Sequence, residues 1–481
     1  MVNVSGRSKG CATCRQAKVK CDLAVPECQR CVRHGSRCPG PRTGALFVNA
    51  GPSHQLRPST TSQQRKRGEL VLARMVESAP CLSLLQPSRA AAFDQLFVSY
   101  FIQSFDQTRH VGSPGGRSAH WLDRLPAFLV EPGSMAPKLA IRAASMLSYG
   151  TAAQDASIQA DAYTWYARAL PALRAVLSGG TCKPPAMDGA VCSAVMLMHF
   201  ETWAKTADQA WIPHVKGVCT MLEAAGPHSC RTGFMHHVFC HVRLQACVEA
   251  MSENVLHPFA SPEWMTSPFE LIPKTFFDEL VDLLFLVQKC LTRATQLMRD
   301  DHGHSRTTDD ALDMWIHEAT SLQHLWRQQY VSFVQTPGGN DSKALEPLSS
   351  PTHCFHFRDV PYTTVSAAAL TSLYHMVSLL LLRLRRQTCD TCIERHTRAI
   401  LLAHDFVLCA SGPSAEFGSI MMLLQLKMAS LWGASLAERV AAESALRNRR
   451  TRSGGFMGVF DTQHGFFAEL AAWVLSECRR V

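Results

Sequence analysis

Six cysteines near the start of the chain follow a spacing that is itself repeated. The spacing is C-x2-C-x6-C-x6-C-x2-C-x6-C, so the unit C-x2-C-x6-C occurs twice, through Cys11, Cys14, Cys21, Cys28, Cys31 and Cys38. Each C-x2-C pair places two thiols on one face of a helical turn, where both can bind one tetrahedral metal ion. Zinc binds four thiolates, so six cysteines complete two zinc sites only if two of them bridge. The repeat nominates the first cysteine of each half, Cys11 and Cys28.

The cysteine segment has too little apolar surface to fold by itself. Its apolar side chains are Ala12, Ala17, Val19, Leu23, Val25 and Val32. Two structural zinc ions would supply the missing free energy, on the order of 10–16 kcal/mol per site. Nearby basic side chains would help to keep the thiolates deprotonated, and these are Arg15, Lys18, Lys20, Arg30, Arg33 and Arg37.

Two other interpretations explain the six cysteines less well. A disulfide framework needs an oxidising compartment, whereas the N-terminal MVNVSGRSKGC has no apolar stretch of signal-peptide length, so we place the chain inside the cell. A four-ligand zinc ribbon would leave two cysteines idle and the repeat unexplained. We therefore expect two Zn²⁺ per chain.

The positive charge of the chain lies in the same region as the six cysteines. Residues 1–67 hold 13 Lys and Arg against two acidic residues, a net charge of +11, whereas the whole chain carries +9. A basic terminal module followed by a nearly neutral remainder is typical of a nucleic-acid-binding protein. A basic segment facing anionic lipid has a similar charge, and the metal-ligand spacing decides in favour of double-stranded DNA as the partner.

Residues 11–38, CATCRQAKVKCDLAVPECQRCVRHGSRC, resemble the DNA-binding domain of the fungal Zn(II)2-Cys(6) binuclear zinc cluster transcription factors. The six cysteines, the basic stretch after the second cysteine, Asp22 after the third and Pro26 in the central loop all match that family. The resemblance implies that Cys11 and Cys28 bridge the two ions. It further implies that the first zinc is completed by Cys14 and Cys21, and the second by Cys31 and Cys38.

The resemblance also implies how this module would contact DNA. A short helix over about Thr13–Val19 would enter the major groove above a CGG-type triplet. Lys18 would read the bases, since lysine can donate to O6 and N7 of guanine, and Arg15 and Lys20 would contact phosphates. Ala17 departs from the pattern, because members often carry Arg or Lys there. The expected function is sequence-specific regulation of RNA polymerase II transcription in the nucleus, with a metabolic or secondary-metabolite gene set as the family's usual target.

The composition changes after the last cysteine. Residues 43–80 are rich in Pro, Gly, Ser, Thr and Gln and have no helical period, so they are predicted to be a flexible linker. The basic run Arg65, Lys66 and Arg67 is a candidate nuclear import signal. Glu69–Ser78 has room for about one heptad before Pro80, so a coiled-coil homodimer through this segment is not supported. We assign residues 1–42 to the zinc cluster domain.

Residues 81–481 are predicted to form one large all-α domain. Apolar residues recur at a spacing of three to four without a convincing alternating strand, over 139–153, 160–177, 190–203, 215–225, 277–298, 311–334, 365–384 and 417–440. The run Val365–Leu382 is broken by Ser, Thr and His, so it is interpreted as a buried helix and not a membrane span. Tyr163–Gly226, with YTWYARALPALRAVL, HFETW and WIPHVKGVCTMLEAAG, resembles the fungal-specific regulatory domain, through which transcription machinery or co-regulators would bind.

Other constellations carry less weight. His237, Cys240 and His241 share a helical face but lack an H-E-x-x-H glutamate, and Cys389, Cys392 and His396 lack a fourth ligand. The aromatic stripe Phe93–Phe105 is assigned to core packing. The sequence has no P-loop, no G-x-G-x-x-G after a strand and no G-x-S-x-G elbow, so no enzyme is predicted. Two rival functions remain, a zinc module that binds a protein partner and an enzyme with a zinc appendage.

Overall fold

The computed structural model divides the chain into two compact units, with the boundary between Leu84 and Leu85. Each unit is described by itself. The described residues are 10–40 in the first unit, and in the second 89–105, 120–133, 135–179, 186–204, 206–207, 210–300, 309–335, 362, 364–385, 390–410, 418, 420–450, 469–472 and 474–475.

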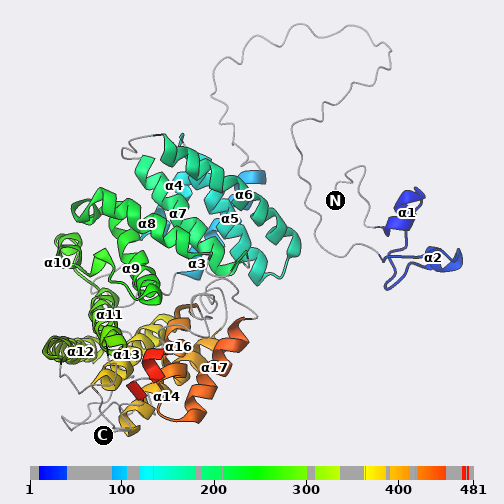
Figure 1. The fold of residues 1–481 in the computed structure, drawn as a ribbon. Helices are drawn as coiled ribbons and strands as arrows, with labels where there is room; N and C mark the ends of the chain where they lie inside the picture. Colours follow the sequence, from blue (N-terminus) through cyan, green and yellow to red (C-terminus); the bar gives the residue numbers. More distant parts are fainter. Residues whose placement is uncertain are drawn as a thin grey trace, which may run out of the picture. The chain divides into compact units, whose positions relative to one another are not determined.

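The first unit contains two one-turn helices, α1 (Ala12–Gln16) and α2 (Gln29–Arg33) (Figure 1). Its buried core consists of cysteines, with Cys21 partly buried against the other five. Val19, Leu23, Val25 and Val32 are all exposed. As expected from the sequence, the described residues of this module form no apolar core, and the buried cysteines take its place.

The second unit is built from helices, and its described residues contain no strand (Figure 1). The helices are α3 (Arg89–Ser104), α4 (Leu125–Val130), α5 (Met135–Ala152), α6 (Ala156–Ser178), α7 (Ala186–Trp203), α8 (Ile212–Ala225), α9 (Gly233–Glu253), α10 (Pro262–Thr266), α11 (Phe276–Asp300), α12 (Asp310–Gln335), α13 (Val365–Leu384), α14 (Asp390–Cys409), α16 (Leu423–Trp432) and α17 (Leu436–Arg450). Consecutive helices pack on one another from α5 to α9, and α11 continues the body toward α12 and α13. This confirms the predicted all-α class.

Two helices differ from the sequence-based expectation. The apolar stretch 417–440 is not one helix, because α16 ends at Trp432 and α17 begins at Leu436. Gly433 ends α16, with its N–H bonded to the carbonyl of Ala429 at 3.0 Å. In contrast, α6 continues through Pro171 without a break, although proline removes one helical hydrogen bond.

Within the described residues one helix, α13, is long and apolar enough to cross a membrane by length and composition. Of its most apolar window, 83% is buried inside the protein. It packs against α11, α12, α14 and α16, and its one buried guanidinium, on Arg383, donates to the carbonyls of Trp432 and Gly433 at 2.9 and 3.0 Å. The helix is thus a core element of the body, as its interrupting polar residues indicated.

The three motifs of the regulatory-domain resemblance meet in the structure. Tyr166 of α6 stacks on Phe200 of α7, with ring centroids 4.1 Å apart. The hydroxyl of Tyr166 lies 3.2 Å from Nε2 of His214 in α8. The three sequence fragments therefore form one packed corner of the helical body, which accounts structurally for why they occur together.

Two pairs of histidines meet through their ring nitrogens inside the body. Nε2 of His199 in α7 is 2.8 Å from Nε2 of His241 in α9. Nδ1 of His375 in α13 is 2.7 Å from Nδ1 of His396 in α14. His199 and His375 are 3% and 2% exposed. In each pair one ring must donate and the other accept, so each joint between two helices requires at least one neutral imidazole.

Arg243 is the fully buried cation of the α9–α11 joint. Its guanidinium contacts the carboxylates of Asp278 and Asp282 on α11. The rings of Phe239, Phe269 and Phe285 also lie within 6.0 Å of it. Removing one partner of a buried ion pair lowers protein stability, because the charge of the other partner is then no longer compensated.

Arg243→Met is therefore expected to destabilise the helical body by about 3–5 kcal/mol, since methionine fills the space but leaves the buried carboxylate of Asp278 without its cation. Denaturant unfolding measures this change. The matched control is Arg447→Met, which breaks the exposed pair with Glu443 and should cost less than about 1 kcal/mol. Equal effects of the two substitutions would contradict the role given to Arg243.

Candidate metal centre and nucleic-acid interface

The six thiols of the first unit converge from the residue before each helix, from α1 and α2 themselves, and from the loops that follow them. Sγ of Cys11 lies 3.8 Å from that of Cys28 and 3.7 Å from that of Cys31, and Cys14 Sγ lies 3.7 Å from Cys28 Sγ. Four sulfurs placed about 2.3 Å from one tetrahedral ion are about 3.8 Å apart. The spacing of the thiols thus fits zinc and is too long for disulfides.

The thiols form two groups of four that share two members. One group is Cys11, Cys14, Cys21 and Cys28, and the other is Cys11, Cys28, Cys31 and Cys38. Within each group all sulfur atoms lie within 4.8 Å of one another. Cys11 and Cys28 belong to both groups, so these two thiols occupy the position that a bridging ligand needs.

Backbone hydrogen bonds follow the sequence repeat with its offset of 17 residues. The N–H of Cys11 donates to Sγ of Cys21 at 3.5 Å, and that of Cys28 to Sγ of Cys38 at 3.4 Å. These N–H groups favour the ionised sulfur, and the Cys11 N–H lowers the pKa of Cys21 to about 7. The Cys28 N–H likewise lowers the pKa of Cys38. In each half a backbone N–H thus favours the thiolate form of the third cysteine, Cys21 or Cys38.

The first helix is shorter than the expected Thr13–Val19. It ends at Gln16, and the N–H of Val19 bonds back to the carbonyl of Cys14 at 3.0 Å. This bond closes a Schellman-type cap, which requires a left-handed residue just after the helix. Lys18 takes that conformation, with φ of 54°. The chain must turn here because Cys21 returns to the backbone of Cys11.

The second half has a glycine at the position equivalent to Lys18. Gly35 has φ of 61°, and the N–H of Ser36 bonds to the carbonyl of Cys31 at 2.9 Å. A left-handed conformation costs a non-glycine residue roughly 1–2 kcal/mol. Lys18 therefore sits in a conformation that glycine would adopt more readily, and its side chain is exposed. Backbone strain of this kind is a frequent mark of a functional position.

The predicted DNA-contact residues lie at or beyond the end of α1. Arg15 belongs to the helix, and Lys18 and Lys20 follow it as exposed residues of the turn and loop. Lys18 therefore lies outside the helix that was expected to carry it. Ala17, which stands where family members often carry Arg or Lys, is an exposed turn residue. The candidate import signal at Arg65, Lys66 and Arg67 lies outside the described residues.

Sequence reasoning missed one residue that fixes the second half. Asp22 was noted only as a match to the family, but its Oδ2 accepts a hydrogen bond from the N–H of Gln29 at 3.1 Å. Gln29 is the first residue of α2, whose N–H groups have no partner within the helix. The N-cap position of α2 is Cys28, and Asp22 lies seven residues before Gln29, so no local capping pattern in the sequence marks this contact.

The competing metal constellations do not assemble. Within the described residues, the two cysteine groups are the sets of three or more ligands that could hold a metal ion. His241 pairs with His199, and Cys240 Sγ lies 3.6 Å from Nε2 of His236 instead of meeting His237. His396 pairs with His375, while Cys389 lies outside the described residues. Phe101 and Phe105 of the aromatic stripe are fully buried core residues.

The comparisons with known proteins agree with this geometry. The family model for the fungal Zn(2)-Cys(6) binuclear cluster domain matches residues 9–42. The aspercryptin biosynthesis cluster-specific transcription regulator atnN of Emericella nidulans is 33% identical over 128 residues, which are 25% of this chain and 19% of the relative. The transcriptional regulator alnR of the same fungus is 40% identical over 57 residues, 11% of this chain and 14% of the relative.

The matches cover less than a fifth of either relative's length, and no solved structure matches the chain. Both relatives are transcription regulators by name and neither is an enzyme. Domains of the matched family bind two zinc ions, and the two groups of four thiols can hold two. Residues 9–42 therefore form a fungal Zn(2)-Cys(6) binuclear zinc cluster domain, and a large helical remainder follows it.

Proposed function

We propose that this chain is a nuclear, sequence-specific DNA-binding regulator of RNA polymerase II transcription that recognises a CGG-type triplet in the major groove. The observation that carries the proposal is the pair of four-thiol groups joined at Cys11 and Cys28 inside a matched zinc cluster domain. In this proposal Cys14 and Cys21 complete one zinc site, and Cys31 and Cys38 complete the other. The zinc ions fold the module and take no part in chemistry.

Lys18 is proposed as the base reader, and Arg15 and Lys20 as phosphate contacts. The left-handed turn places Lys18 just beyond the C-terminal end of α1, on an exposed surface. A lysine there can donate to guanine O6 and N7, while Lys20 follows in an extended segment. The strained backbone at Lys18 supports a specific role for this side chain, since glycine would satisfy the fold alone.

The rest of the chain is proposed to control this module. We assign residues 1–42 to DNA binding, 43–80 to a linker with an import signal, and 81–481 to a regulatory body that binds transcription machinery or co-regulators. The relative atnN is named for a biosynthesis cluster, which supports a metabolic or secondary-metabolite gene set as the target.

Lys18→Gly tests the base reader without disturbing the fold, because glycine accepts the left-handed turn. The variant should keep two zinc ions and lose about 1–3 kcal/mol of binding to a CGG duplex, with discrimination against mutated triplets flattened. Fluorescence anisotropy on matched and mutated duplexes measures both quantities. Retained triplet preference would show that another residue reads the bases.

Lys20→Ala provides the matched comparison for a phosphate contact. It should weaken binding to all duplexes about equally and reduce the slope of log K against log salt by about one. A salt titration of both variants distinguishes a side chain that recognises bases from one that contacts phosphates. Loss of triplet preference in Lys20→Ala alone would exchange the two roles.

A further inference from the structure

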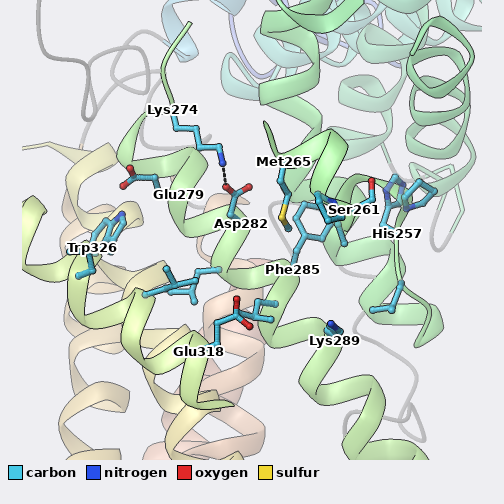
Figure 2. Close-up of a pocket in the computed structure, with 18 of the residues that line it drawn as sticks. His257, Ser261, Met265, Lys274, Glu279, Asp282, Phe285, Lys289, Glu318 and Trp326 are labelled. Atoms are coloured by element: carbon cyan, nitrogen blue, oxygen red, sulfur yellow. Dashed lines mark ion pairs between the residues drawn. The ribbon is translucent and has the colours of Figure 1, made fainter. Parts of the chain in front are cut away.

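The helical body contains a cavity of about 900 Å³ that the DNA-binding function does not use (Figure 2). It lies between α11, α12 and the segment from the short 3-10 helix η4 (Pro258–Ala260) through α10. Its volume falls within the range of sites that hold a small organic ligand. All of its walls come from residues 256–329 of the second unit.

Much of the cavity wall is apolar surface that folding leaves in water. Leu256, Leu322 and Leu325 line the cavity and are 50%, 45% and 48% exposed. Phe285 and Trp326 also line the cavity and are almost fully buried. Exposed large apolar groups gathered in one concave site indicate a ligand that would cover them.

The cations in the wall already have partners. Lys274 Nζ lies 2.5 Å from Oδ2 of Asp282, a contact drawn in Figure 2, and Arg243 contacts the same carboxylate. Lys289 Nζ lies over the ring of Trp315, 3.8 Å from its centroid. The positive groups are therefore engaged by the protein itself.

Two carboxylates in the wall are left to act as acceptors. Glu279 Oε2 is buried and has no hydrogen-bond partner within the described part of the chain. Glu318 lines the same cavity from α12, and no ion pair joins it to a described residue. Burial raises the pKa of Glu279, which is the expected response of a carboxylate that lacks a donor.

We propose that this cavity binds an apolar small molecule that carries a protonated amine, with the amine donating to Glu279 and the apolar body covering the exposed leucines. Such a ligand places a cation beside the Glu279 carboxylate and removes apolar surface from water in one event. A carboxylate ligand would meet an excess of negative charge, because the lining holds three acidic groups and two lysines.

Three probes that share one tricyclic skeleton test the proposal on the full-length zinc-loaded protein. They are dehydroabietylamine, dehydroabietol and dehydroabietic acid, which differ only in the amine, hydroxyl or carboxylate. Titration calorimetry is expected to show the amine binding at least about ten-fold more tightly than the acid. Equal binding of amine and acid, or no binding of the amine, would overturn the proposal.

Two pairs of variants test whether the probes bind in this cavity. Glu279→Gln should remove most of the preference for amine over alcohol, while Glu263→Gln, an exposed position on α10 outside the cavity, should not. Leu325→Lys should weaken the amine and the alcohol at least about ten-fold, because it replaces apolar surface with a cation. Met314→Lys, also exposed on α12 but outside the lining, is its control. Unchanged amine binding in both Glu279→Gln and Leu325→Lys would place the probe elsewhere and refute this site.

Discussion

Removal of zinc by a strong chelator is expected to abolish the ordered structure of residues 10–40. The buried core of this module is made of cysteines, and its larger apolar side chains, such as Val25 and Val32, are exposed. Nothing else in the module can replace a metal contribution on the order of 10–16 kcal/mol per site. A fragment of residues 1–45 should therefore lose its dispersed amide spectrum on chelation and regain it when zinc returns.

The zinc prediction has a stoichiometric part and an internal control. Elemental analysis should give two zinc ions per chain, because Cys11 and Cys28 are shared by both thiol groups. One zinc per chain would refute the bridged arrangement. The helical body serves as the control, since its described residues offer no comparable ligand group. Its helical circular dichroism should persist in the same chelator.

The metal centre was predictable because its chemistry is written in local spacing. The ligands lie within 28 residues, and the C-x2-C unit fixes which thiols share a helical turn. The turn at Lys18 was not expected, since no propensity marks a lysine for positive φ. The repeat nevertheless held a usable signal, because Lys18 stands where the second half has Gly35.

The helical body was predictable in class but only partly in detail. Helices with one apolar face, such as α11, follow the expected period closely. In contrast α9 was recognised only through the helical face that His237, Cys240 and His241 share, and its bounds were not predicted. The helix is buried on most sides and carries buried polar residues such as His236, Arg243 and Glu249. A helix without a polar face has no clear period to detect.

Contacts between distant residues were beyond any local pattern. His199 and His241 are 42 residues apart, and His375 and His396 are 21 apart. Nothing in the sequence links the members of a pair, since His199 follows an apolar run whereas His396 stands among charged residues. Only the packing of α7 on α9 and of α13 on α14 brings the rings together. The amine cavity is hidden from the sequence for the same reason.

Acidification is expected to destabilise the helical body strongly because of these pairs. Desolvation, and the second histidine in each pair, lower the pKa of His199 and His375 well below 6.5. Desolvation also lowers the pKa of His241 to about 3 and of His396 to about 4. In the unfolded chain all four titrate near 6.5. The unfolded state therefore binds more protons whenever the pH is below that value, and folding loses free energy as the pH falls.

The size and the window of the effect follow from these values. Stability should be fully present above about pH 7 and should decline from about pH 6.5 down toward the folded pKa values of about 3–4. At pH 5 a histidine that titrates near 6.5 in the unfolded chain and at about 3–4 in the folded one costs about 2 kcal/mol, so His241 and His396 together remove about 4 kcal/mol. His199 and His375 act in the same direction. Urea unfolding of the body at pH 7.5 and pH 5.0 measures the difference.

Variants separate the histidine pairs from general acid effects. His199→Gln should flatten the pH dependence between pH 7 and pH 5, because the replaced side chain no longer gains a proton on unfolding. His317→Gln on the exposed face of α12 is the matched control and should leave the dependence as in the parent protein. An equal flattening by both variants, or a body as stable at pH 5.0 as at pH 7.5, would mean that the buried imidazoles do not hold α7 to α9 and α13 to α14 as neutral pairs.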